Sequence, residues 1–206
     1  LKNLTAICIT HVHGDHCYGL PGLLATTAMS GRTEPLTIIA PNGIEELIKL
    51  TLNLTDTHLS YSINFIDIET IESTVDFEEF KISAIELSHR VRSFAYSFTE
   101  RNISRKLDIN KLESLGVEKG PLWGQLQRGE SITLNDGSQL KANDCYLKDD
   151  IPRKIILGGD NDNPELLLDA SKGASLIVHE ATYTQAISDK VGPGPQHSSA
   201  KAVAIF

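Results

Sequence analysis

The amino-acid sequence predicts an α/β protein, and three observations support this class. In the N-terminal part, apolar segments rich in β-branched residues alternate with segments that have the pattern of amphipathic helices. A long stretch of strand-like segments follows, and strand and helix patterns alternate again towards the C-terminus. The 206 residues are 40% hydrophobic and 22% charged, so the chain is long and apolar enough to bury the core of one globular domain.

The expected elements follow from these patterns in chain order. Apolar, β-branched runs predict strands at 6–10 and 36–40, and amphipathic runs predict helices at 20–30 and 43–53. Strand patterns recur at 62–68, 75–87, 93–98 and 154–160. Asn163 and Pro164 supply a cap and a first-turn proline for a short helix through Ala170. A strand at 175–179 follows, and either Ser198 or Ser199 is expected to cap a helix at 200–206.

The loop after the first strand carries the densest set of reactive side chains. His11, His13, Asp15 and His16 place three imidazoles and one carboxylate within six positions. Mixed nitrogen and oxygen donors suit zinc-like divalent ions. Because His11 and His13 are two residues apart, whereas ligands on one helix face are three or four apart, we expect a loop here. The alternative is a set of solvated loop histidines that bind no metal.

The order His-x-His-x-Asp-His at 11–16 resembles the signature of the metallo-β-lactamase superfamily of two-metal hydrolases. The resemblance implies an αβ/βα sandwich, apparently truncated at both ends because the pattern starts late and stops early. It also implies that His89 and Asp160 complete the ligand set, with Asp160 bridging two metals. Two Zn²⁺ ions per chain are expected, with Mn²⁺ or Mg²⁺ as alternatives. Without the resemblance, His89 reads as an ordinary surface histidine.

Three further motifs resemble those of the ribonuclease Z family, whose members trim the 3′ end of precursor tRNA. They are Val178-His179-Glu180-Ala181-Thr182, Gln196-His197-Ser198-Ser199-Ala200 and the Gly-Pro-containing run at 115–130. The resemblance implies that a metal-activated hydroxide attacks the phosphorus and that Asp15 both binds metal and accepts the proton. His197 then assists the leaving 3′ oxygen, and Glu180 is expected to orient His197. Without the resemblance, Glu180 would be interpreted as an ordinary acidic residue at the end of a strand, and His179 as a residue that packs in the core.

Residues 99–150 are expected to form an inserted arm within one domain that covers 1–206. The resemblance implies that precursor tRNA binds the arm and that the chain forms a homodimer, and we assign Lys119 and Arg128 to substrate binding. The net charge of −8 opposes phosphate binding overall. A local excess of five basic over three acidic residues at 101–119 offsets this charge, whereas 145–154 contains acids.

Several features bear on the cellular compartment. No apolar run approaches the ~20 residues of a membrane span, and the first residues lack the order of a signal peptide. Cys8, Cys17 and Cys145 are scattered, which argues against a disulfide framework. We therefore predict a cytoplasmic protein that does not contact a membrane.

Two other functions stay open. One is a two-metal hydrolase of small esters, such as a phosphodiesterase, sulfatase or lactamase. The other is a non-catalytic partner that binds tRNA or dimerises. Turnover of small chromogenic diesters alone favours the first, and RNA binding without metal favours the second.

Overall fold

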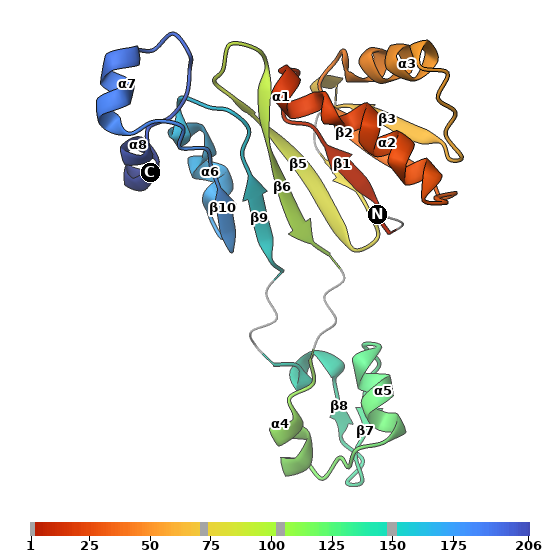
Figure 1. Cartoon of the computed structure of the whole chain (residues 1–206). Coiled ribbons are helices and arrows are strands. Elements are labelled where there is room, and N and C mark those ends of the chain that lie inside the picture. Colours follow the sequence, from red (N-terminus) through yellow and green to blue (C-terminus); the bar gives the residue numbers. More distant parts are fainter. Residues whose placement is uncertain (1–2, 71–73, 102–105, 148–151) are drawn as a thin grey trace. The chain divides into compact units, whose positions relative to one another are not determined.

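The computed structural model describes residues 3–70, 74–101, 106–147 and 152–206, which form two compact units (Figure 1). Unit 1 comprises Leu1–Asp76, Lys81–Thr99 and Lys154–Phe206, and unit 2 comprises Phe77–Phe80 and Glu100–Arg153. Parts of the expected arm at 99–150 lie outside the described residues, namely 102–105 and 148–150, as does 151. The assignment of 99–150 to an arm inserted in a single domain stays a prediction.

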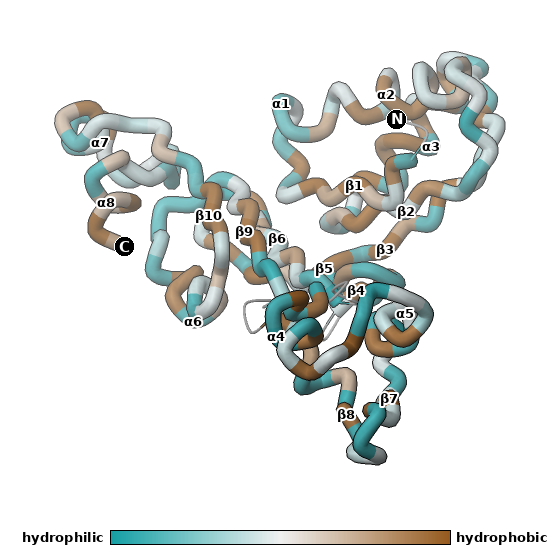
Figure 2. The backbone as a smooth tube through the Cα atoms, turned by 90° about the horizontal axis from the view of Figure 1, so that it is seen from below, coloured by the Kyte–Doolittle hydropathy of each residue, from teal (hydrophilic) through white to brown (hydrophobic). Residues whose placement is uncertain are grey.

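The N-terminal half of unit 1 is a three-stranded parallel sheet in the order β1-β2-β3. Its strands are β1 (Ala6–Cys8), β2 (Leu36–Ala40) and β3 (Ile63–Asp67). Parallel neighbours need crossovers, and α2 (Gly19–Met29) and α3 (Ile44–Leu54) supply them. Both helices place apolar residues on the sheet, where Leu24, Ile38 and Ile48 are fully buried. Figure 2 shows hydrophobic residues recurring along these elements.

The second sheet of unit 1 has the order β10-β9-β6-β5-β4. Its strands are β4 (Val75–Asp76), β5 (Phe80–Leu87), β6 (Ser93–Glu100), β9 (Lys154–Leu157) and β10 (Leu176–Val178). β9 pairs with β6 in antiparallel and with β10 in parallel orientation. The 3-10 helix η3 (Pro164–Leu167) and α6 (Leu168–Ser171) connect β9 to β10, and Leu167 packs with Leu87, Ala95 and Ile156 on one face.

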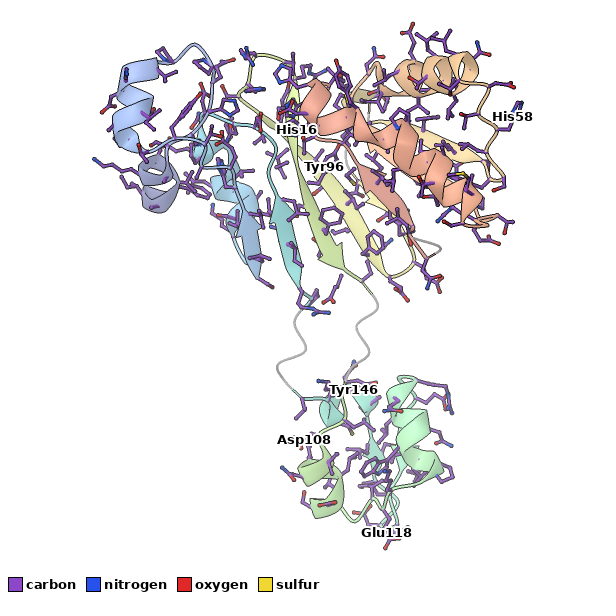
Figure 3. All side chains as sticks on the ribbon, in the orientation of Figure 1. His16, His58, Tyr96, Asp108, Glu118 and Tyr146 are labelled. Atoms are coloured by element: carbon purple, nitrogen blue, oxygen red, sulfur yellow. The ribbon has the colours of Figure 1, made fainter. Side chains whose placement is uncertain are left out.

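The opposite face of the second sheet contacts the first sheet through Tyr96. Ala95 and Tyr96 are successive residues of a strand, so their side chains point to opposite faces. The Tyr96 hydroxyl donates to the carbonyl oxygens of Ile9 at 2.7 Å and Ile39 at 3.3 Å (Figure 3). Burial raises the pKa of Tyr96 well above its ordinary value, so the hydroxyl stays a donor. The two sheets of unit 1 are thus joined by a hydrogen bond as well as by apolar packing.

Unit 2 has its own apolar core. It contains α4 (Ile109–Ser114), α5 (Pro121–Gln127), the short hairpin of β7 (Ile132–Thr133) and β8 (Gln139–Leu140), and η2 (Ala142–Cys145). Leu112, Leu126 and Cys145 are fully buried in this core. The Asp108 carboxylate caps α4 by accepting from the Lys111 N–H at 3.0 Å.

The α/β class and most elements of unit 1 agree with the sequence-based predictions, with shorter strands at several ends. Unit 1 also contains α1 (Gly14–Cys17), η1 (Ile68–Thr70), α7 (Gln185–Val191) and α8 (Ala200–Ile205). Ser199 is the N-cap of α8, and its hydroxyl accepts from the Ala202 N–H at 3.1 Å. Asn163 is the N-cap residue and Pro164 lies in the first turn, as predicted, but the Asn163 side chain makes no capping hydrogen bond and the turn is 3-10. No helix in the described ranges is long and apolar enough to cross a membrane.

Candidate metal centre

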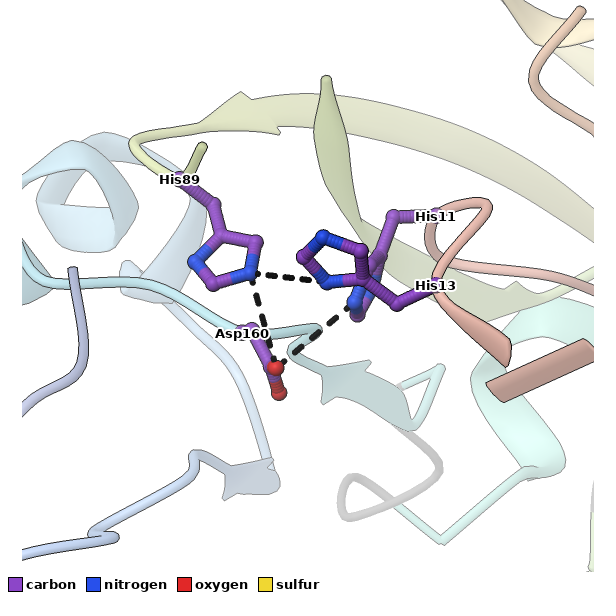
Figure 4. A group of neighbouring side chains, drawn as sticks. All are labelled: His11, His13, His89 and Asp160. Carbon is purple, nitrogen blue, oxygen red and sulfur yellow. Dashed lines mark hydrogen bonds and ion pairs between the residues drawn. The ribbon is translucent and has the colours of Figure 1, made fainter. Parts of the chain in front are cut away.

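Three loops at one edge of unit 1 bring predicted ligands together. The loop after β1 carries His11 and His13, the turn between β5 and β6 carries His89, and the end of β9 delivers Asp160 (Figure 4). One ligand atom from each of these four residues lies within 4.8 Å of the other three. Donors that share one divalent ion at about 2 Å each are separated by roughly 3–4 Å. The group therefore has the size of a metal site.

The Asp160 carboxylate is surrounded by imidazoles. Its Oδ2 lies 3.6 Å from His11 Nε2, 3.7 Å from His89 Nε2 and 3.5 Å from His16 Nε2. His89 Nε2 lies 3.2 Å from His13 Nδ1. The side chains of His11 and His89 are fully buried, and that of Asp160 is 15% exposed. A single carboxylate oxygen thus lies within 3.7 Å of nitrogens from three imidazoles.

The partners of the outer ring nitrogens direct the inner ones towards the centre. His89 Nδ1 lies 2.9 Å from the Gln196 carbonyl oxygen, which only accepts, so Nδ1 carries the proton and Nε2 presents a lone pair. His11 Nδ1 is held 3.0 Å from the Thr10 hydroxyl. His11 Nε2 is buried and has no hydrogen-bond partner in the described part of the chain. An unpaired buried nitrogen costs about 1–3 kcal/mol, so this donor set fits a divalent metal.

Two imidazoles of the group, His11 and His13, favour their neutral form. The pKa of His11 is lowered from 6.5 to about 4, mainly by burial and also by the neighbouring His16, against the opposite effect of Asp160. Burial and the neighbouring His89 also lower the pKa of His13. A histidine must be neutral to bind a metal, so both side chains are ready to act as ligands at neutral pH.

Asp15 and His16 lie on the short helix α1 (Gly14–Cys17), so the prediction of a loop throughout 11–16 is wrong for this turn. The turn directs His16 towards Asp160 and leaves the Asp15 side chain 81% exposed, 3.5 Å from His16 Nε2. Asp15 therefore stands at the rim of the group. A Cβ at Gly14 would lie 2.3 Å from the ring of Tyr18, so a larger residue there would require this exposed ring to move.

Gly159 sets the approach of Asp160 to the first sheet. A Cβ at Gly159 would lie 2.7 Å from both the Ser93 hydroxyl and the Thr10 Cβ, closer than real Cβ atoms come. The Phe94 N–H also donates to the Thr10 carbonyl at 3.0 Å. Only glycine lets the end of β9 come this close to the loop that carries His11.

His197 and Glu180 lie in contact beside the metal group. His197 Nδ1 lies 3.2 Å from Glu180 Oε1, and His197 Nε2 lies 3.8 Å from Asp160 Oδ2. Burial raises the pKa of Glu180, but hydrogen bonds from the N–H groups of Ser198 and Thr182, from the Thr182 hydroxyl and from the Asn161 N–H lower it more, so its pKa lies below its usual value. The carboxylate is thus ionised and orients the ring of His197.

Sequence reasoning missed the residues that orient the ligands. Thr10 and Gln196 hold the outer nitrogens of His11 and His89, and Asn161 is fully buried behind Asp160. The contact of Gln196 is made by its backbone, so its side-chain type gives no signal in the sequence. Thr10 and Asn161 each stand next to a predicted ligand, and this adjacency was the available signal. His179 turns away from the centre, with Nδ1 2.5 Å from the Glu180 carbonyl oxygen.

The predicted substrate-binding residues belong to unit 2. Lys119 is exposed and lines a groove of about 510 Å³ formed by residues 115–122 and 133–135. Arg128 Nε donates to Glu130 Oε1 at 2.8 Å, and both side chains are largely exposed. Of the basic residues predicted to offset the negative charge, Arg105 lies outside the described residues, and Lys111 Nζ donates to the Asp144 carbonyl at 2.6 Å.

Comparisons with known proteins relate the chain to several relatives. A family model described as anti-Pycsar protein Apyc1 matches residues 1–109. Curated proteins named ribonuclease Z from Marinobacter nauticus and Pseudomonas putida (strain GB-1) are 50% and 44% identical over 206 residues. These relatives confirm the resemblance to ribonuclease Z. The matches cover the whole chain and 64% of each relative, so the chain spans less than two thirds of their length.

Two solved structures have a similar fold. The crystal structure of human tRNase Z, short form, is 25% identical, with a TM-score of 0.63 over 100% of this chain and 68% of that chain. The metallo-β-lactamase fold protein YhfI from Bacillus subtilis is 16% identical, with a TM-score of 0.53 over 95% of this chain and 56% of that chain, a likeness of fold alone. The predicted metallo-β-lactamase fold is confirmed.

Proposed function

The chain belongs to the family whose model is described as anti-Pycsar protein Apyc1 and is homologous to ribonuclease Z along all its residues, and from this premise we propose that it is an endoribonuclease that removes the 3′ trailer of precursor tRNA. The group of His11, His13, His89 and Asp160, with His197 beside it, carries this proposal. Metal donors and an acid–base pair meet at one edge of unit 1, which suits hydrolysis of a phosphodiester.

We assign one metal position to His11, His13 and His89, and a second to Asp15 and His16, with Asp160 contributing to both. The buried, unpaired His11 Nε2 and the short distances around Asp160 support this assignment. We propose two Zn²⁺ ions per chain, because histidine-rich sets suit Zn²⁺ while Mg²⁺ and Mn²⁺ favour oxygen donors. When bound, such ions lower the pKa of water and stabilise negative charge on phosphate oxygens.

The chain's own residues move the protons in this proposal. Asp15, exposed at the rim, accepts a proton from the attacking water. The Nδ1–H of His197 donates a hydrogen bond to Glu180, and this contact leaves Nε2 facing Asp160. From Nε2 it gives a proton to the 3′ oxygen as the bond between phosphorus and that oxygen breaks. The ionised Glu180 stabilises the charged form of His197 before this transfer.

Precursor tRNA is the proposed substrate, and we assign Lys119 and Arg128 of unit 2 to its phosphates. The exposed pair of Arg128 with Glu130 contributes little stability in solvent, so a phosphate is able to replace the carboxylate. A homodimer and a cytoplasmic location remain part of the proposal through the resemblance to ribonuclease Z. Because contacts between basic side chains and phosphates release counterions, this binding of tRNA should weaken as salt rises.

A cleavage assay with a precursor tRNA that carries a 3′ trailer tests the function. We expect metal-dependent release of the trailer and a loss of at least about 10²-fold in kcat for His13→Ala, because the variant removes a ligand. His58→Ala is the matched control, since His58 is exposed on the loop after α3 and lies away from His16 (Figure 3).

A small chromogenic phosphodiester should be tested in parallel. Turnover of this diester with no cleavage of any precursor tRNA would replace the proposal by the small-ester hydrolase. RNA binding that needs no metal and leads to no cleavage of either substrate would replace it by the non-catalytic partner.

A further inference from the structure

Asn161 occupies an unusual place in unit 1. It follows Asp160 directly, and its side chain is fully buried. Asp160 faces the imidazoles, whereas the amide of Asn161 lies among loops behind the metal group. A buried primary amide needs hydrogen-bond partners for its two N–H donors and for the two lone pairs of its oxygen. Its contacts therefore show which side-chain types this position can accept.

All four hydrogen-bonding positions of the Asn161 amide are occupied. Oδ1 accepts from the N–H of Ser88 at 3.1 Å and from the N–H of Asn163 at 3.2 Å. Nδ2 donates to the Asn163 carbonyl at 2.9 Å and to His179 Nε2 at 3.0 Å. The two backbone donors and the backbone acceptor fix which end of the amide is oxygen, because a flipped amide would face each of them with the wrong atom.

The backbone of Asn161 extends these contacts to a further loop. Its carbonyl oxygen accepts from the buried Ser198 hydroxyl at 2.6 Å, and its N–H donates to Glu180 Oε1 at 3.4 Å. The Asp162 N–H also donates to the Ser88 carbonyl at 3.0 Å. Asn161 and the residue after it thus connect the loops that follow β5, β9 and β10 with the loop before α8.

Three partners of Asn161 stand next to a residue assigned to the site. Ser88 precedes His89, His179 precedes Glu180, and Ser198 follows His197. Asn161 itself follows Asp160. A displacement of the amide would therefore change the separations of His89 and His197 from Asp160, which are now 3.7 and 3.8 Å.

We propose that Asn161 is a positioning residue that sets the geometry of the metal group. Its buried side-chain amide holds Ser88 beside His89 and His179 beside Glu180, and in doing so fixes the backbone that carries Asp160 and contacts Ser198. The inference rests on the proposed metal-dependent function but concerns metal binding, so it does not depend on which phosphodiester is cleaved. No other side-chain type provides the same contacts. A carboxylate lacks the donors for Asn163 and His179, and a threonine hydroxyl offers one donor and a shorter reach.

The test compares Asn161→Ala and Asn161→Thr with Asn163→Ala in the 206-residue chain. Asn163→Ala removes the same amide from an exposed position two residues away. The affinity for Zn²⁺ is measured by competition with a chelator, and the visible spectrum of the Co²⁺-loaded protein reports ligand geometry. We expect Asn161→Ala to weaken Zn²⁺ binding about 10–100-fold and to alter the Co²⁺ spectrum. Asn161→Thr should fall between it and wild type, and Asn163→Ala should match wild type.

If Asn161 only stabilised the fold, its replacement would not change metal binding. If folded Asn161→Ala protein binds Zn²⁺ with wild-type affinity and has the wild-type Co²⁺ spectrum, the proposal is overturned, whatever its melting temperature. If Asn161→Ala does not fold, Asn161→Thr decides on the same two readouts. A wild-type chain that binds neither ion would also overturn the inference. If metal binding depends on Asn161 but the chain cleaves no precursor tRNA, the inference about Asn161 is supported and only the proposed function is overturned.

Discussion

Two neighbouring polar regions of unit 1 differ in whether the chain itself provides hydrogen-bond partners for their polar atoms. In the metal group of His11, His13, His89 and Asp160, His89 Nε2 lies 3.2 Å from His13 Nδ1, and the Nε2 atoms of His11 and His89 lie 3.6 and 3.7 Å from Asp160 Oδ2. The buried His11 Nε2 has no hydrogen-bond partner in the described ranges. The Glu180 carboxylate, in contrast, has several donors around it. The first region is left for a cation that the chain does not supply, whereas the chain completes the second region by itself.

The donors of Glu180 come from four residues. Oε1 accepts from the N–H of Ser198 at 2.8 Å and of Asn161 at 3.4 Å and faces His197 Nδ1 at 3.2 Å. Oε2 accepts from the N–H and the hydroxyl of Thr182, both at 2.8 Å. The contrast predicts that changes in the metal group alter metal content, while changes around Glu180 alter the reaction and leave the metal in place.

The largest effect is expected from Asp160→Ala. This variant removes the carboxylate that three imidazoles surround, so we expect metal content to fall from two ions per chain to fewer than one. Cleavage of precursor tRNA should fall by about 10³-fold or more. Elemental analysis and single-turnover kinetics measure the two effects. Asp169→Ala, which removes a carboxylate that is 95% exposed, should change neither.

A smaller effect is expected from Glu180→Gln. The amide carries no negative charge and has donors where Ser198 and Thr182 also donate, so His197 loses its charged partner. We expect kcat to fall by roughly 10²-fold with metal content unchanged. A loss of metal in this variant would show that the two regions are not separate in function.

The pH dependence of stability should differ between the two regions in the metal-free chain. The folded state opposes protonation of His11, whose pKa is about 4 instead of 6.5, so stability should decline as the pH falls from 6.5 towards 4, by roughly 3 kcal/mol in all. The pKa of Glu180 is also lowered, so its stabilising contribution is present above pH 4.5 and is lost only as the pH falls below that value.

Urea unfolding at a series of pH values measures these two effects. His11→Gln removes the titrating group and should flatten the curve between pH 6.5 and 4. An unchanged slope in this variant would assign the decline to another group.

The smallest effect is expected from Thr182→Val. The variant removes one hydroxyl donor to Glu180, while the Thr182 N–H still donates. A hydrogen bond to an ionised carboxylate contributes about 1.5 kcal/mol or more, so kcat should fall roughly tenfold. Steady-state kinetics with the metal-loaded chain measure this change. A decrease as large as that of Glu180→Gln would mean that the hydroxyl, and not the charge, orients His197.

The sequence predicts most elements of unit 1 because their signals are local. His11, His13 and Asp160 follow apolar strands, and the strand ends bring them to one edge. The helix α1 was not predicted, because a single turn has no apolar period. The elements of unit 2 were not predicted either, because they are too short to show a clear apolar period.

The contacts behind the ligands could not be predicted. Asn161 is paired with Ser88 and with His179, and these pairs form only once three strands have placed their ends together. The anchor of His89 is the Gln196 backbone, whose φ of 55° belongs to no predicted element. Such contacts depend on tertiary structure, whereas residue types and spacing report mainly on local structure.

The positions of the ligands along the chain affect how the fold is held together. His11 and Asp160 are 149 positions apart in the sequence, and His11 Nε2 lies 3.6 Å from Asp160 Oδ2. An ion that binds both side chains would act as a reversible cross-link, and the stretch of chain that it closes includes all of unit 2. Closing a long loop removes conformational entropy from the unfolded chain, as a disulfide does. The melting temperature of the chain should therefore follow the concentration of free metal, even where no substrate is present.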